Sequence, residues 1–169
     1  MPPQFLVRLW RVILSSSTLS QSRLTLHVAA DLALAHRLAL RDHFGATPVA
    51  EVADPLRAVN ANPGDIAAIA AASPWAAALA DGQARVITAL PIAGHGAPEL
   101  LVFGHAEAQA SGDDVTVVLS KTPAASALWR LRSGEWHVAG LAGFLQPADL
   151  PGRTIAGRYP APLALEASP

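Results

Sequence analysis

Residues 23–72 constrain the fold more than any other segment, because strand and helix patterns alternate through them with short connections. Leu24, Leu26 and Val28 alternate with polar residues, which is the period of two expected of a strand. Residues 31–44 then have apolar positions around most of a helix, and Gly45 is placed to end it. The first part of this segment therefore predicts a strand followed by a helix.

The same order repeats directly afterwards. Residues 47–52 are predicted to form the second strand. Asp54-Pro55 predicts the start of a second helix, with a side-chain acceptor at the N-cap and a fixed φ at the first helical position. Residues 65–72 form a continuous apolar run, as in a strand covered on both faces. Together the two repeats predict a parallel α/β unit.

Composition excludes several classes of partner and cofactor. The 169 residues are 51% hydrophobic, enough for one substantial core or for two small lobes that share a sheet. A net charge of −1 with 12 Lys and Arg gives no basic surface for nucleic acid or an anionic membrane, so we expect neither partner. The absence of Cys fits a cytoplasmic protein. No nucleotide-binding or metal motif occurs, so we expect no cofactor and no metal.

The longest apolar run in the middle of the chain, residues 66–80, is broken by Ser73-Pro74 and is too short to span a bilayer. We therefore predict that it belongs to the core.

The first segment of the chain comprises residues 1–22. Within it, residues 4–21 are predicted to form an amphipathic helix. Ser17 and Gln21 continue its apolar stripe at helical spacing, whereas Arg8 and Arg11 point elsewhere. The helix could simply pack on the α/β core. Alternatively, because an unpartnered apolar stripe is an unusual monomer surface, it could form a homodimer. The apolar residues of the stripe are Leu6, Leu9, Trp10, Ile13 and Leu14.

The spacing of this stripe resembles the third helix of the all-helical chorismate mutases. The resemblance implies catalytic roles for Ser17 and Gln21, with the Gln reaching the ether oxygen of the bond that breaks. A Claisen rearrangement needs no nucleophile, so such a site positions a reactive conformer and stabilises developing charge. The family supplies cations for the dicarboxylate substrate from its first two helices. We therefore expect catalysis only if those helices come from upstream coding sequence or a partner.

Residues 23–110 resemble a prephenate dehydratase domain, a two-lobed α/β fold like that of periplasmic binding proteins. The resemblance rests on Arg41-Asp42-His43-Phe44-Gly45 and on Gly64-Asp65-Ile66. Where that family has Thr-Arg-Phe, this chain reads Ala97-Pro98-Glu99 and continues as a strand. The catalytic Thr has no counterpart, so dehydratase activity is not expected.

Three polar residues follow the three predicted parallel strands: Asp31, Asp54 and Ser73. Ligands of open parallel sheets lie at the carboxyl ends of the strands, so these residues predict a ligand-binding cleft. Each Asp is also an ordinary N-cap. Two carboxylates at helix N-termini would repel a dicarboxylate, so an amine-bearing or neutral ligand fits this cleft better than prephenate does.

The C-terminal third predicts a strand at residues 115–120, a helix from Thr122-Pro123 to about Arg132, and a strand at residues 136–145. The resulting βαβ module, residues 111–159, resembles the start of an ACT-type regulatory domain, which in the family binds phenylalanine. It could equally complete the preceding domain. Residues 160–169 are predicted to be a loose tail.

Two functional hypotheses follow. One is a chorismate mutase family protein of aromatic amino acid biosynthesis, inactive as this isolated chain. The other is a non-catalytic small-molecule-binding or regulatory domain derived from prephenate dehydratase. The expected partners are chorismate or an aromatic amino acid, and a second copy of the chain bound through the N-terminal helix.

Overall fold

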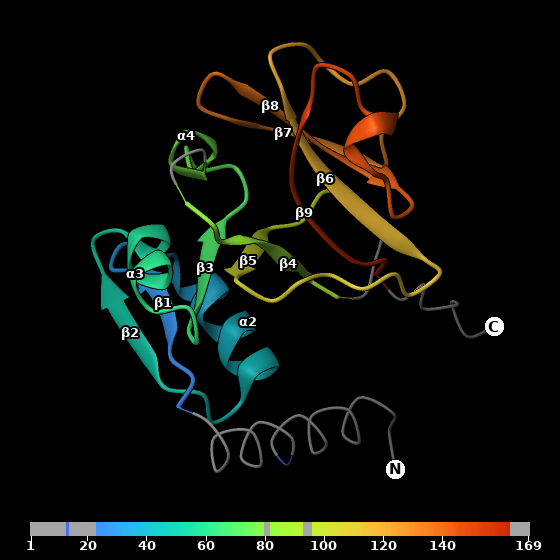
Figure 1. Ribbon diagram of the computed structural model, residues 1–169. Coiled ribbons are helices and arrows are strands. Elements are labelled where there is room, and N and C mark those ends of the chain that lie inside the picture. The colour runs from blue at the N-terminus through green and yellow to red at the C-terminus, as the bar shows by residue number, and fades with distance from the viewer. Residues whose placement is uncertain (1–12, 14–22, 80–81, 93–95, 163–169) are drawn as a thin grey trace, which may run out of the picture.

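Nine strands form one sheet in the computed structural model, which describes residues 13, 23–79, 82–92 and 96–162 (Figure 1). The sheet order is β2-β1-β3-β5-β4-β9-β6-β8-β7. The predicted mixed α/β class is confirmed. The elements are β1 (Leu26–Ala29), α2 (Leu34–Phe44), β2 (Val49–Val52), α3 (Pro55–Ala61), β3 (Ile66–Ala70), α4 (Ala76–Leu79), β4 (Arg85–Leu90), β5 (Leu100–Gly104), β6 (Asp114–Ser120), β7 (Trp129–Ser133), β8 (Trp136–Ala142), the 3₁₀ turn Pro147–Asp149 and β9 (Thr154–Pro160).

The first three strands form the parallel unit that the sequence predicts. Leu26 of β1 is in register with Val49 of β2 on one side and with Ile66 of β3 on the other, and all three strands run the same way. Leu40 of α2 packs on one face of these strands, whereas Val59 of α3 belongs to the core on the opposite face. Helices therefore cover both faces, which explains the apolar character of β3.

The start of α2 differs from the prediction. The helix begins at Leu34 with Ala33 at the N-cap, and Asp31 lies in the preceding turn. The turn is closed by the Leu32 N–H, which donates to the Ala29 carbonyl at 3.1 Å. Residues 31–33 therefore belong to the connection between β1 and α2. The end of the helix is as predicted: Gly45 has φ of 59° and donates its N–H to the Arg41 carbonyl.

The sheet then departs from a purely parallel arrangement. β5 lies between β3 and β4 and is antiparallel to both. β4 joins the C-terminal strands through one parallel pairing, between Val86 and Gly157 of β9. A Cβ on Gly157 would lie 2.1 Å from the Val86 carbonyl oxygen, so only glycine permits the two backbones to approach this closely.

The C-terminal strand-helix-strand prediction is wrong in its middle element. Residues 122–128 form turns and coil, and the chain continues as β7, which pairs with β8 in a hairpin. Trp129 explains the outcome, because its ring packs directly over Gly140 of β8 and its Nε1–H donates to the Tyr159 hydroxyl at 3.1 Å. A helix would break this cross-strand contact. Strand β9 was not predicted and overlaps the start of the predicted tail only at Pro160.

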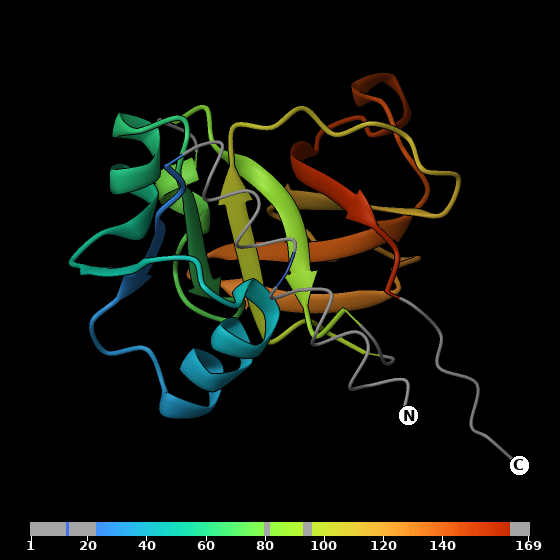
Figure 2. The ribbon, with the colours of Figure 1, turned by 90° about the horizontal axis from the view of Figure 1, so that it is seen from below.

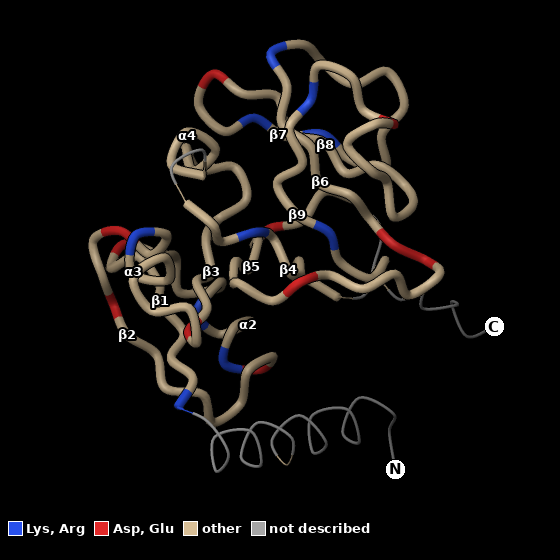
Figure 3. The backbone as a smooth tube through the Cα atoms, in the orientation of Figure 1, with Lys and Arg blue, Asp and Glu red and all other residues tan. Residues whose placement is uncertain are grey.

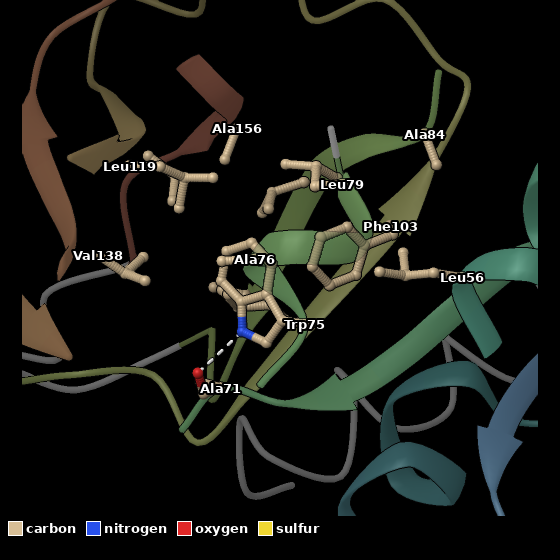
Figure 4. Packing of buried hydrophobic residues seen from close by; sticks show 14 of the residues in the cluster. Leu56, Ala71, Trp75, Ala76, Leu79, Ala84, Phe103, Leu119, Val138 and Ala156 are labelled. Atoms are coloured by element: carbon tan, nitrogen blue, oxygen red, sulfur yellow. Dashed lines mark hydrogen bonds between the residues drawn. The ribbon is translucent and has the colours of Figure 1, made fainter. Parts of the chain in front are cut away.

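One hydrophobic cluster connects the two halves of the sheet. Trp75 meets the edge of the Phe103 ring at a centroid distance of 5.2 Å and donates Nε1–H to the Ala71 carbonyl (Figure 4). The same cluster includes Leu119 of β6 and Val138 of β8. In Figure 2 the orange strands lie behind the green and yellow ones, so the sheet curls around this cluster. No helix in the described part of the chain is long and apolar enough to cross a membrane.

Candidate functional site

The two residues predicted to be catalytic, Ser17 and Gln21, lie outside the residues that the structure describes. Their roles stay predictions from sequence.

The predicted cleft residues follow strands whose carboxyl ends share one edge of the sheet. Asp31 lies in the turn before α2, whereas the side chains of Asp54 and Ser73 have local partners. Asp54 caps α3, accepting the Arg57 N–H at 3.0 Å. Ser73 donates its hydroxyl to the Ala70 carbonyl at 2.7 Å. The N–H at the start of α4 is satisfied by another residue, since Ala76 donates to Ser133 Oγ at 2.8 Å. The cavities described below are lined by other residues, so the cleft stays a prediction.

A polar groove lies where β4 meets β9, and we call it the β4–β9 groove. It has a volume of about 520 Å³. Basic positions of β4 and β9 lie close together at this junction, and acidic positions occur along the loop that leads from β5 to β6 (Figure 3). The lining comes from four segments of the chain: Gln83, Arg85, Val86, His105, Ala106, Glu107, Ala108, Pro147, Ile155, Gly157 and Arg158.

The two arginines of this groove are held by backbone carbonyls rather than by carboxylates. Arg158 donates Nε–H and Nη2–H to the Leu145 carbonyl at 2.9 and 2.6 Å, and its guanidinium lies 4.6 Å from the centre of the Phe144 ring. Arg85 donates from Nη1 to the carbonyls of Gly82 and Ala84. Neither forms an ion pair with any described residue. Both positive charges are thus fixed in place but not neutralised by a carboxylate.

One acidic residue, Glu107, is part of the groove lining. Glu107 lines both the groove and an adjoining cavity of about 190 Å³. Arg158 and Asp114 also line this smaller cavity. The Ser111 hydroxyl donates to Asp114 at 2.7 Å, and with the N–H groups of Ser111 and Gly112 it lowers the pKa of that carboxyl. Asp114 is therefore engaged in shaping its own turn. Glu107 has no ion-pair partner among the described residues and is available to a ligand.

His105 lines the groove and is oriented by the first half of the molecule. Its Nε2 donates to the Val59 carbonyl at 3.2 Å, which fixes the tautomer in the neutral ring. The other ring nitrogen is then an acceptor in that form.

A second polar pair, unexpected from the sequence, lies within the parallel unit. Buried His27 bonds through Nε2 to Asp65 Oδ2 at 2.9 Å, and Asp65 Oδ1 accepts the Thr25 N–H. The pair joins β1 to the residue that precedes β3. It lines none of the cavities described here, and its role is to connect two strands.

The groove residues gave no signal in the sequence. Arg85 and Arg158 are 73 positions apart, and no motif contains either residue. They lie together only because Val86 pairs with Gly157. Among the described residues, no group of three or more His, Asp or Glu could hold a metal ion.

Comparison with known proteins adds little to this description. No family model matches the chain, and no curated protein matches it. A crystal structure of prephenate dehydratase from Streptococcus mutans overlays with a TM-score of 0.48 and 9% sequence identity, covering 85% of this chain and all of that one. A likeness of this size carries no functional information.

Proposed function

We propose that the described body is a non-catalytic small-molecule-binding or regulatory domain and that its ligand binds in the β4–β9 groove. The observation that carries this proposal is that one groove contains two carbonyl-held arginines with no carboxylate partner among the described residues. Two guanidinium groups fixed in one groove without an anion are unfavourable, because their like charges repel each other. A ligand carboxylate would supply the missing charge.

The chemistry of the lining favours a small zwitterion with an apolar part. Arg85 and Arg158 can bind a carboxylate, and Glu107 of the same lining can bind an ammonium group. Val86, Ile155 and Pro147 offer apolar contact. An aromatic amino acid, one of the two ligand types expected from the sequence, has all three features. Chorismate, the other type, has no ammonium group for Glu107.

Titration calorimetry of the full chain with L-phenylalanine and with chorismate tests this proposal. We expect saturable binding of L-phenylalanine. Arg85→Gln should weaken it about tenfold or more, because a hydrogen bond to a charged group contributes about 1.5–3 kcal/mol. Arg132→Gln is the matched control, since Arg132 is an exposed arginine on β7 outside the groove. Equal affinities in the two variants, or no binding by the unaltered chain, would overturn the proposal.

The chorismate mutase hypothesis is a second candidate, carried by the spacing of the N-terminal stripe. Under it, Ser17 and Gln21 would line a pocket whose cationic residues come from outside this chain. We expect no turnover of chorismate by the purified chain, and turnover once the missing cationic helices are supplied. Gln21→Ala should then abolish that turnover. Turnover by the chain alone would refute the requirement for additional cations.

The proposal of a small-molecule-binding or regulatory domain includes the derivation of residues 23–110 from a prephenate dehydratase-like domain. It rests on the Arg41 to Gly45 and Gly64 to Ile66 motifs.

A further inference from the structure

A second groove lies at one end of the sheet, between α2 and the edge strand β2, and we call it the α2–β2 groove. Its volume is about 520 Å³. Leu34 and Leu38, one turn apart on α2, are 71% and 59% exposed, and Val49 of β2 is 56% exposed. These three are among the few large apolar side chains that the described chain leaves open to water. Such a contiguous apolar patch is typical of a binding surface.

The groove is held open by a fixed polar contact rather than by loose side chains. Arg37 of α2 forms an ion pair with Glu51 of β2 and donates to the Leu32 and Ala30 carbonyls. The arginine thus ties the helix to the strand and to the turn before the helix. A preformed wall of this kind lowers the entropy lost when a partner binds.

The position of β2 adds a second reason to expect a partner. β2 is the last strand of the sheet and pairs only with β1, so its outer edge is open among the described residues (Figure 1). Open edges are usually covered, charged or kept short. Glu51 places one charge on this strand, but Val49 lies beside the groove without cover.

The sequence of the chain itself includes an apolar segment of matching character. The stripe of residues 6–14 has no acidic residue, and Ile13, its one described member, is 48% exposed. Eight residues separate Leu14 from Arg23, and Leu26 is in direct register with Val49. The tether reaches at most about 30 Å when fully extended. The tether joins the described body at Arg23, three residues before Leu26, so the stripe can reach the groove.

We propose that the apolar stripe of residues 6–14 docks in the α2–β2 groove of its own chain. A short tether raises the effective concentration of the segment to the millimolar range, which favours its own groove over that of a second copy. Helical i, i+3 and i+4 residues in an apolar groove are a common recognition mode. The homodimer expected from the sequence would use the same stripe, so the two arrangements exclude each other.

Paired cysteine substitutions in the full chain test this docking, because the natural sequence has no Cys to interfere. We expect Ile13→Cys to form an intramolecular disulfide with Leu38→Cys or Leu34→Cys under mild oxidation. The matched control is Ile13→Cys with Leu128→Cys, since Leu128 is 58% exposed but lies beyond β6 and outside the groove. Docking predicts that at least one groove pair forms about tenfold faster than the control pair, with a rate independent of protein concentration.

Two other outcomes would overturn the proposal. Disulfide-linked dimers whose yield rises with protein concentration would assign the groove to a second copy. Equal rates for the groove pairs and the control pair would mean that the stripe does not dock there. Leu34→Glu can be added to the variant that combines Ile13→Cys with Leu38→Cys. If the groove is the docking site, disulfide formation should become about tenfold slower. An unchanged rate would count against the docking proposal. Loss of docking would leave the ligand proposal intact, because the two grooves share no residue.

Discussion

The two halves of the sheet are built by different rules. In the first, from β1 to β3, strands and helices alternate along the chain, and β2 and β3 lie on either side of β1 as its parallel neighbours. In the second, β6 is paired with β8 and with β9, so that Asp114 lies opposite Pro160. Short repeated sequence patterns predict the contacts within the first half, whereas contacts within the second half form between segments that are distant in sequence. Sequence periodicity is therefore informative mainly where neighbours in the chain are neighbours in space.

Burial shows the same contrast. Strand β2, at the edge, alternates between exposed and half-buried residues, whereas all seven residues of β6 are buried. The polar residues of β6 have specific partners. Thr116 donates its hydroxyl to the Gly143 carbonyl at 2.6 Å and accepts the Leu145 N–H at 3.0 Å. The alternation in β6 therefore does not mark a solvent face, because its polar side chains anchor a loop that covers the strand.

The most destabilising substitution that we predict lies at the junction between the two halves. Gly157→Ala should cost more than about 3 kcal/mol, because its Cβ would collide with the Val86 backbone. The measurement is the free energy of unfolding from urea denaturation. Gly64→Ala is the matched control, since nothing lies within 4 Å of a Cβ at that position. Equal stabilities of the two variants would show that the β4–β9 pairing does not connect the halves.

An alkaline titration sharpens the description of the second half. Burial raises the pKa of Tyr159 to about 12. The hydrogen bond from Trp129 lowers this pKa, but its effect is smaller than that of burial. The unfolded chain ionises near the ordinary pKa of about 10, so between pH 10 and 12 the folded state holds the proton more tightly. Stability should therefore fall by about 2–3 kcal/mol across that interval.

Tyr159→Phe should remove this pH-dependent part of the loss. At neutral pH the same substitution should cost about 1–3 kcal/mol, because Trp129 Nε1 would lose its acceptor in the core. An alkaline slope that is unchanged in Tyr159→Phe would mean that the hydroxyl is not buried as described. Thermal unfolding followed over pH 8–12 provides the measurement.

The smallest expected effect tests the local construction of the first half. Asp54→Ala removes the side chain that caps α3 and should destabilise the protein by about 1 kcal/mol. Asp31→Ala is the control, because Asp31 lies in a turn and caps no helix. Urea denaturation of both variants measures the difference. A larger loss from Asp31→Ala would contradict the observed start of α2 at Leu34.

The sequence determined those parts of the structure in which the physical cause is local. A Pro after an N-cap acceptor begins α3, a glycine with positive φ ends α2, and the apolar run at residues 65–72 contains β3. Each of these features is decided by a few adjacent residues through sterics, capping or burial on both faces.

The other features of the fold depend on contacts between distant segments. Residues 122–132 have helical start signals, yet the contact of Trp129 with Gly140 and Tyr159 makes the last of them a strand. The β4–β9 groove likewise unites Arg85, Glu107 and Arg158 only through the close backbone contact at Gly157. Pairings between distant segments outweigh local propensity because they bury large side chains, and no local pattern records them.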